Sequence, residues 1–217
     1  MRQARRMPDG SPGGGAPMKS LNGYPRFDPN PSAEVGVRIL RAAGVPFALA
    51  GRVAVWTYVP PEGHVFTKDV DFAVPYGYAE AIEDAAREAG YETSRLSIGG
   101  VGLRKGDIAV DFVDRHPHAS ALFADAVAAA RTGGRRAGDG EAEAPVVPRR
   151  HLLVMKLIPR EPDDERDVVE LLKTMGADEY REARGLVEKH LGFLGVEHLD
   201  ALARRIGHAG VEPRYGK

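Results

Sequence analysis

Two short stretches of the chain alternate strictly between apolar and polar residues, a pattern that predicts half-buried β-strands. In residues 67–74 the apolar side chains fall on one face, and Asp69 and Asp71 fall on the other. Residues 107–113 repeat the pattern, with the apolar residues on one face and Asp111 on the other. Carboxylates at i and i+2 of a strand lie about 7 Å apart and repel each other unless a cation lies between them. The pattern therefore predicts two strands that share an acidic face and hold a divalent cation.

Elsewhere the apolar residues recur at helical spacing, and glycine or proline ends most runs. Further strands are predicted at residues 47–50, 91–96 and 100–104. Helices are predicted at residues 30–43, 52–58, 78–89, 119–131, 149–158, 164–175, 178–190 and 196–206. Strands early in the chain and helices late in the chain predict an α+β fold. We expect a mixed β-sheet flanked by helices, followed by a C-terminal helical bundle.

Glycine and proline divide the chain into four parts. Residues 1–29 are predicted to form a disordered tail, and Met18 is an alternative start to Met1. Residues 30–132 form the α/β core, residues 133–148 a flexible loop, and residues 149–217 a C-terminal helical region.

The composition narrows the possible chemistry. The 217 residues carry a net charge of −1, so no overall field draws the protein to nucleic acid or to anionic lipid. The absence of cysteine excludes disulfides, thiolate catalysis and cysteine-bound metals. No apolar run approaches the roughly 20 residues of a membrane span, so we expect a cytoplasmic protein without a membrane partner.

Further residues extend the acidic pattern into a recognisable order of motifs. The candidate residues are, in chain order, Gly51, Arg52, Thr67, Lys68, Asp69, Asp71, Asp111, Lys156, Asp164 and Asp167. This order resembles that of the DNA polymerase β-type nucleotidyltransferase superfamily over residues 33–175. It is most similar to the bacterial branch of minimal nucleotidyltransferases and AbiEii-like abortive-infection toxins. The resemblance implies a nucleotidyltransferase-like core.

The resemblance implies a metal site on the acidic strands. Asp69 and Asp71 would bind the catalytic ions, Mg²⁺ or Mn²⁺. Asp111 would share an ion and help to deprotonate the acceptor hydroxyl. Thr67 and Lys68, which lead into the first acidic strand, would contact the nucleotide.

The resemblance also implies a phosphate site. Gly51 and the N–H groups after it would cradle the triphosphate, and Lys156 would neutralise its charge. Asp164 and Asp167, at i and i+3 of a helix, fall on one face and would orient Lys156 or add metal contacts.

The chain departs from the family pattern at two positions. Arg52 stands where the family has a small residue, so it either pairs with phosphate or points away from it. Val65 stands where the family often has arginine, and Lys68, His64 or Arg52 would replace that cation.

The function implied is transfer of NMP from an NTP such as ATP to a hydroxyl acceptor. The acceptor is a tRNA end, a protein side chain or a small molecule, and a toxin role would add an antitoxin protein as partner. Two alternatives remain open from the residues. One is a catalytically degenerate protein that binds nucleotide or acts as an interaction module. The other is a metal-dependent phosphoester hydrolase that uses the same carboxylates.

Overall fold

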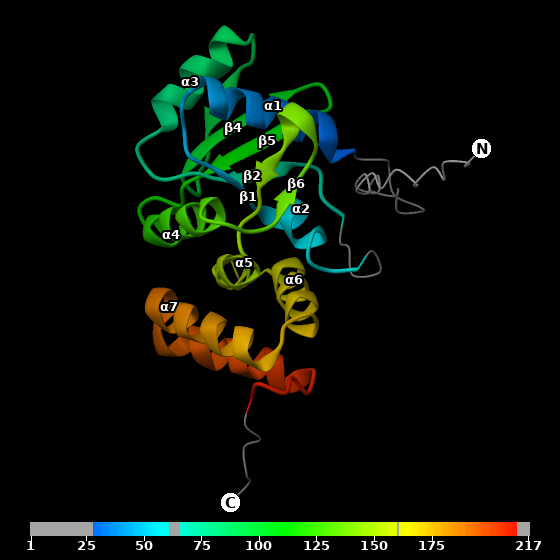
Figure 1. Ribbon diagram of the computed structural model, residues 1–217. Coiled ribbons are helices and arrows are strands. Elements are labelled where there is room, and N and C mark those ends of the chain that lie inside the picture. The colour runs from blue at the N-terminus through cyan, green and yellow to red at the C-terminus, as the bar shows by residue number, and fades with distance from the viewer. Residues whose placement is uncertain (1–27, 61–65, 160, 212–217) are drawn as a thin grey trace, which may run out of the picture.

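The computed structural model describes residues 28–60, 66–159 and 161–211 (Figure 1). The helices are α1 Pro29–Ala42, α2 Gly51–Trp56, α3 Ala79–Glu88, α4 Ser120–Arg131, the 3₁₀-helix η2 Gly140–Ala142, α5 Arg149–Lys156, α6 Pro162–Lys173 and α7 Ala177–Arg205. The strands are β1 Ala48–Leu49, β2 Val70–Ala73, β3 Thr93–Arg95, β4 Gly100–Lys105, β5 Ile108–Val113, β6 Arg136–Ala137 and β7 Ala144–Pro145.

Five strands form a mixed sheet in the order β1-β2-β5-β4-β3. The central pair β2 and β5 is parallel, and every other pair in this sheet is antiparallel. The two strands with acidic faces are therefore direct neighbours. The predicted mixed sheet flanked by helices is confirmed.

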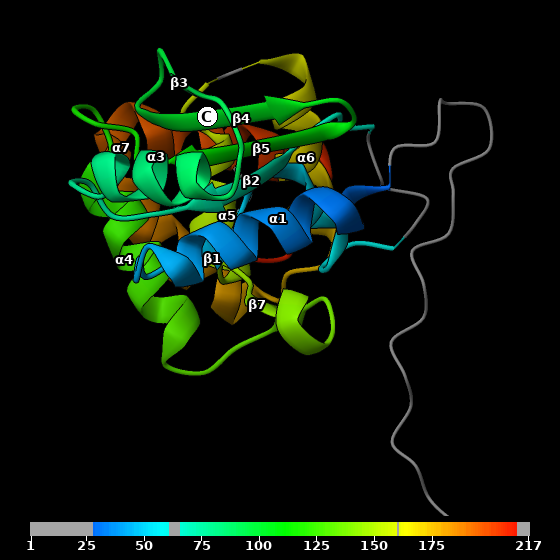
Figure 2. The ribbon, with the colours of Figure 1, turned by 90° about the horizontal axis from the view of Figure 1, so that it is seen from above.

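Helices α1 and α3 cover the apolar face of the sheet (Figure 2). Phe72 of β2 and Phe112 of β5 stack on this face with ring centroids 6.2 Å apart. The backbone of α1 approaches closely at Gly36, where a Cβ atom would lie 2.4 Å from the Phe72 ring. Because side chains alternate along a strand, the acidic residues of β2 and β5 point to the opposite face.

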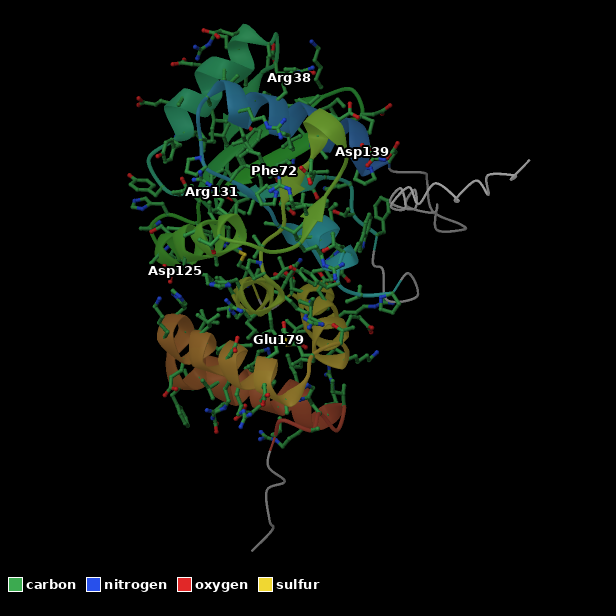
Figure 3. The ribbon with its side chains drawn as sticks, viewed as in Figure 1. Arg38, Phe72, Asp125, Arg131, Asp139 and Glu179 are labelled. Atoms are coloured by element: carbon green, nitrogen blue, oxygen red, sulfur yellow. The ribbon has the colours of Figure 1, made fainter. Side chains whose placement is uncertain are left out.

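Helices α5, α6 and α7 lie together below the sheet in the view of Figure 1, and α5 contacts α2, α4, α6 and α7. Two ion pairs tie this region together, Asp125 of α4 with Lys189, and Arg149 of α5 with Glu179 (Figure 3). Helix α7 is interrupted at Gly192, whose φ of 68° is left-handed. The two helices predicted for this stretch are thus joined through a kink.

The first helix begins earlier than the sequence pattern indicates. Asp28 caps α1 by accepting a hydrogen bond of 3.0 Å from the N–H of Asn30. Two residues assigned to the tail therefore belong to the ordered chain. The rest of the predicted tail, residues 1–27, lies outside the described residues.

The segment 133–148 differs from the flexible loop that its composition predicts. It contains β6, η2 and β7, and the N–H of Val147 donates to the carbonyl of Leu49 at 2.9 Å. Val146 and Val147 are fully buried. Burial of these two valines against β1 outweighs the glycine-rich and acidic composition of the neighbouring residues, and the segment becomes a hairpin fixed to the sheet edge.

Within the described ranges, none of the helices combines the length and the apolar character that crossing a membrane requires.

One buried histidine makes the helical region sensitive to acid. Burial, and after it the charge of the adjacent Arg150, lower the pKa of His151 in α5 to about 4, whereas Asp125 opposes the shift. Between about pH 6.5 and pH 4 the unfolded chain takes up a proton that the folded chain does not. The free energy of unfolding should therefore fall as the pH drops, by about 1.4 kcal/mol per pH unit. His151→Leu should remove this contribution in urea unfolding measured from pH 4.5 to 7.5.

The exposed His118 supplies the matched control. His118→Leu should keep the wild-type dependence of stability on pH. If the free energy of unfolding falls equally steeply toward low pH in His151→Leu and in the wild type, another group is responsible for the dependence on pH.

Candidate functional site

The acidic residues of the two central strands lie side by side. Asp71 of β2 pairs directly with Asp111 of β5 in the parallel ladder. Asp69 comes two residues before Asp71, so it continues the same alternation just ahead of β2. On the far side of Asp111 the ladder partner is Gly102 of β4, where a Cβ atom would lie 3.1 Å from Asp111 Oδ1. Three carboxylates thus share one face of the sheet.

Gly51 brings the start of α2 into direct contact with Asp71. Its φ is +59°, and a Cβ atom there would lie 1.8 Å from Asp71 Oδ2. The N–H of Ala50 donates to the Asp71 carbonyl at 2.8 Å, which fixes the turn against β2. Glycine is therefore required here by the approach of a carboxylate. Helix α2 has six residues, so its dipole is small. The contact with triphosphate that the resemblance implies for Gly51 remains a prediction.

The Asp71 carboxyl lies in an unfavourable environment for a negative charge. Burial, and after it the charges of Asp69 and Asp111, raise its pKa to about 7. The cations Lys156 and Arg104 act in the opposite direction but do not restore the ordinary value. A cation placed among the three carboxylates would relieve this strain.

Arg104 is a site residue that we did not select from the sequence. Its Nη1 atom donates to Asp111 Oδ1 at 2.7 Å and to the Val110 carbonyl at 2.9 Å, and its Nη2 atom lies 3.9 Å from Asp69 Oδ2. It lies two positions after Gly102, so strand alternation puts it on the same face as Gly102 and Asp111. That signal becomes usable only when β4 and β5 are treated as one hairpin.

A buried ionic cluster joins α2, α5 and α6 next to the carboxylates. Lys156 Nζ lies 2.7 Å from Asp164 Oδ1 and 2.8 Å from Asp167 Oδ2. Burial lowers the pKa of Lys156, but the charges of Asp167 and Asp164 outweigh it and raise the pKa overall. The predicted i, i+3 pair on α6 therefore contacts Lys156 directly, and Lys156 in turn acts electrostatically on Asp71.

Arg52 belongs to the same cluster. Its Nε atom donates to Asp167 Oδ2 at 3.2 Å, its Nη1 atom donates to the Phe66 carbonyl at 2.7 Å, and Asp163 lies 3.6 Å away. The guanidinium thus connects α2 to α6. Contact between Arg52 and nucleotide remains a prediction. In this structure the guanidinium is bound to Asp167 and to the Phe66 carbonyl.

Thr67 and Lys68 lead into β2 in different ways. The hydroxyl of buried Thr67 donates to Asp69 Oδ1 at 2.9 Å, which holds that carboxylate in place. Lys68 is exposed. His64, one candidate for the missing cation, and Val65, which stands where that cation is missing, lie outside the described residues.

Arg115 is a second cation that the sequence patterns did not single out. It lies four residues after Asp111, beyond the end of β5, with a left-handed φ of 53°. Burial lowers its pKa, and the charges of Asp164 and Asp71 oppose that shift, so it lies within electrostatic reach of both carboxylates. Neither carboxylate forms an ion pair with it. No helix or strand periodicity marks this position, which explains why it was missed.

The donor set suits a hard divalent cation, since carboxylate oxygens are the ligands that Mg²⁺ and Mn²⁺ prefer. The raised pKa of Asp71 indicates a deficit of positive charge at this point. As the side chains stand, no three acidic or histidine residues of the described chain are gathered closely enough to hold an ion. Arg104 lies between two of the three carboxylates, so binding of a metal requires that this side chain move.

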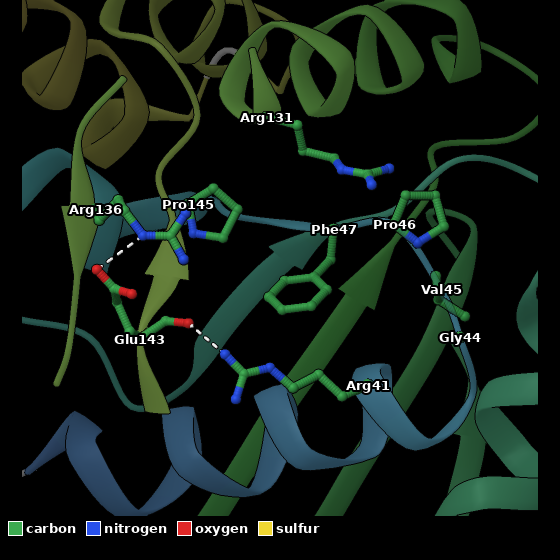
Figure 4. Close-up of a pocket in the computed structure, with 9 residues that line it drawn as sticks. All are labelled: Arg41, Gly44, Val45, Pro46, Phe47, Arg131, Arg136, Glu143 and Pro145. Atoms are coloured by element: carbon green, nitrogen blue, oxygen red, sulfur yellow. Dashed lines mark hydrogen bonds and ion pairs between the residues drawn. The ribbon is translucent and has the colours of Figure 1, made fainter. Parts of the chain in front are cut away.

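A separate cavity of about 340 Å³ lies at the β1 edge, away from the predicted site residues (Figure 4). Arg41, Arg131 and Arg136 surround it, and Phe47 lines its wall. The carboxylate of Glu143 partly balances the positive charge, because its Oε1 atom pairs with Arg136 at 2.8 Å. The backbone carbonyl of Glu143 accepts a hydrogen bond from Arg41 at 3.0 Å.

Loss of the Arg52 side chain should act mainly on the fold. Arg52 is 15% exposed and its partner Asp167 is 1% exposed, so Arg52→Ser leaves a buried carboxylate with Lys156 as its remaining ion-pair partner among the described residues. We expect the free energy of unfolding to fall by about 2–4 kcal/mol in urea titration.

The control for this prediction is Arg87→Ser, because Arg87 pairs with Asp84 on the surface of α3 and is 72% exposed. That change should cost less than about 0.5 kcal/mol. If Arg52→Ser unfolds like the wild type but changes affinity for an NTP, the side chain acts on the nucleotide and not on α6.

Comparison with known proteins gives structural likenesses only. No family model and no curated protein matches the chain. The solution structure of the antibiotic-resistance factor ANT(2'')-Ia aligns over 80% of this chain and 91% of its own, with 17% identity and a TM-score of 0.40. A nucleotidyltransferase-like protein from Paracoccidioides brasiliensis aligns over 85% and 94%, with 14% identity and a TM-score of 0.44.

A tRNA-processing enzyme in an apo form aligns over 84% of this chain and 59% of its own, with 15% identity and a TM-score of 0.31. Likeness at these values carries no weight for activity. The function proposed below therefore rests on the residues of this chain.

Proposed function

We propose that the protein is a metal-dependent nucleotidyltransferase that moves NMP from an NTP to a hydroxyl acceptor. The observation that carries this proposal is the pairing of Asp71 with Asp111 across two parallel strands, in a setting that raises the pKa of Asp71 to about 7. The order of motifs along the chain favours nucleotidyl transfer over other uses of such carboxylates.

Asp69, Asp71 and Asp111 would hold Mg²⁺ or Mn²⁺. When bound, the metal would offset charge on the phosphate oxygens and favour ionisation of the attacking hydroxyl. Thr67 would keep Asp69 oriented through its hydrogen bond of 2.9 Å.

The remaining residues have roles in binding and proton transfer. Lys156, Lys68 and Arg115 are the cations that would contact the triphosphate. Arg52 would help to position Lys156, because both side chains pair with Asp167. The acceptor oxygen forms a bond to the α-phosphorus as the bond from that phosphorus to the β-phosphate oxygen breaks. Pyrophosphate leaves, and the hydroxyl proton passes to Asp111.

The nucleotide is proposed to be ATP, and the acceptor a tRNA end, a protein side chain or a small molecule with hydroxyl groups. In the AbiEii-like variant of this proposal, transfer to a cellular acceptor would make the protein a toxin that is neutralised by a partner antitoxin. This toxin role is tested by expressing the protein in cells: the wild type should arrest growth, and Asp111→Asn should not.

The decisive experiment incubates the protein with each α-³²P-labelled NTP, Mg²⁺ or Mn²⁺, and either total tRNA, cell lysate or an aminoglycoside. We expect label on an acceptor, and equimolar pyrophosphate, with the wild type and with Asp107→Asn, which alters an exposed turn residue. Asp111→Asn should transfer no label. Free phosphate without a labelled acceptor would indicate a phosphoester hydrolase instead, and binding of NTP without turnover would indicate a degenerate nucleotide-binding protein.

A further inference from the structure

Arg104 occupies the position between two of the three carboxylates. Its guanidinium hydrogen-bonds Asp111 at 2.7 Å and reaches to 3.9 Å from Asp69. The guanidinium therefore offsets part of the negative charge on the acidic face.

The neighbouring residues give this side chain the space to reach across the strands. Arg104 pairs with Ala109 in the β4–β5 ladder, and the next position on the same face pairs Gly102 with Asp111. Ala109 carries only a methyl group and Gly102 has no side chain, so neither residue blocks the path of the Arg104 side chain over β5. A long side chain from β4 can therefore lie over β5 and reach carboxylates on both β5 and β2.

Arg104 also has a route away from the site. Its side chain is 49% exposed, and its contacts other than those with the two carboxylates are single hydrogen bonds to the carbonyls of Leu103 and Val110. These bonds can be exchanged for water at little net cost. The guanidinium can thus leave the carboxylates without disturbing the core.

We propose that Arg104 is a built-in counterion that competes with the divalent metal for Asp69 and Asp111, so that it sets the metal affinity of the site. This inference rests on the proposed function, because it assigns the carboxylates to a metal. In the metal-free protein Arg104 holds the two carboxylates. Binding of the metal displaces it toward solvent, where it remains tethered to β4 beside the site.

The test is Mn²⁺ binding by isothermal titration calorimetry to the nucleotide-free protein. Arg104→Gln keeps a polar side chain but removes the competing charge, so we expect Mn²⁺ to bind about tenfold more tightly than to the wild type. Arg104→Lys keeps the charge and should bind Mn²⁺ with nearly wild-type affinity. Arg95→Gln is the matched control, since Arg95 lies on the adjacent β3 but pairs with Glu83 at 2.6 Å, and its affinity should be unchanged.

A second readout is thermal stability without metal. Arg104→Gln should melt at a lower temperature than the wild type in EDTA, and saturating Mn²⁺ should remove that difference. Unchanged or weaker Mn²⁺ binding in Arg104→Gln would overturn the inference, and so would the absence of Mn²⁺ binding in both proteins.

Transfer of labelled NMP is measured separately. Transfer by a wild type whose metal affinity does not depend on Arg104 would refute the counterion role alone. An effect of Arg104 on Mn²⁺ affinity without transfer to any acceptor would refute the nucleotidyltransferase proposal alone.

Discussion

Asp71→Asn should abolish the stabilisation of the protein by Mg²⁺ with NTP and reduce NMP transfer by at least about 100-fold. Loss of a group that merely orients a metal ligand typically costs 10–100-fold, and Asp71 would be a ligand itself. Its carboxylate also lies in an unfavourable environment for a negative charge, since burial is the main cause that raises its pKa to about 7. Thermal melting with and without Mg²⁺ and NTP measures the first effect, because a ligand that binds only the folded state raises the melting temperature.

The same variant should be more stable than the wild type in metal-free buffer at pH 8. Unfolded Asp71 loses its proton near its ordinary pKa of 3.8, whereas the folded protein keeps it up to about pH 7. Across this window the folded state binds more protons, so rising pH lowers the stability of the wild type by up to about 1.4 kcal/mol per unit. Asparagine does not titrate, and the contribution disappears.

Asp107→Asn changes an exposed carboxylate of the β4–β5 turn and should leave the response to metal and the dependence on pH as they are in the wild type. A full Mg²⁺ and NTP shift in Asp71→Asn would place the metal site elsewhere.

Gly51→Ala should be among the most destabilising single substitutions in the chain. The left-handed φ of +59° costs a residue with a side chain about 1–2 kcal/mol. The added methyl group would also lie 1.8 Å from Asp71 Oδ2 and 2.7 Å from Asp71 Cβ, so either the carboxylate or the start of α2 must shift, at about 1–3 kcal/mol. We expect a total loss of about 2–5 kcal/mol in urea unfolding, together with loss of metal binding.

Gly44 separates these two costs, because its φ is +65° and nothing lies within 4 Å of its virtual Cβ atom. Gly44→Ala should therefore lose only the backbone part, about 1–2 kcal/mol, and retain metal binding. Equal losses in the two variants would mean that the contact with Asp71 is unimportant.

Local patterns were sufficient for the strands of the five-stranded sheet and for the acidic face. Alternation in residues 67–74 and 107–113 placed Asp71 and Asp111 on the side of the strand away from Phe72. The parallel pairing of β2 with β5 then brings the two carboxylates together. A period of two residues survives in any sheet that buries one face, which is why this part could be predicted.

The contacts that hold the site depend on tertiary structure, which no local pattern encodes. Arg52 meets Asp167 across 115 positions of the chain, and Arg104 reaches Asp69 only because a hairpin places β4 beyond β5. The hairpin within residues 133–148 was missed for the same reason. Its two buried valines pack against β1, which is far away in the sequence. The composition of residues 133–148 alone predicts a flexible loop.

The cluster around Asp167 has a consequence for how this sequence can evolve. One carboxylate on α6 serves a cation from α2 and a cation from α5, with distances of 3.2 Å to Arg52 and 2.8 Å to Lys156. Replacing any one member leaves unmatched charge in a buried place, so drift at these positions has to proceed by joint changes. Homologous chains should accordingly exchange Arg52 and Asp167 together, so that a small residue in place of Arg52 accompanies an uncharged residue in place of Asp167.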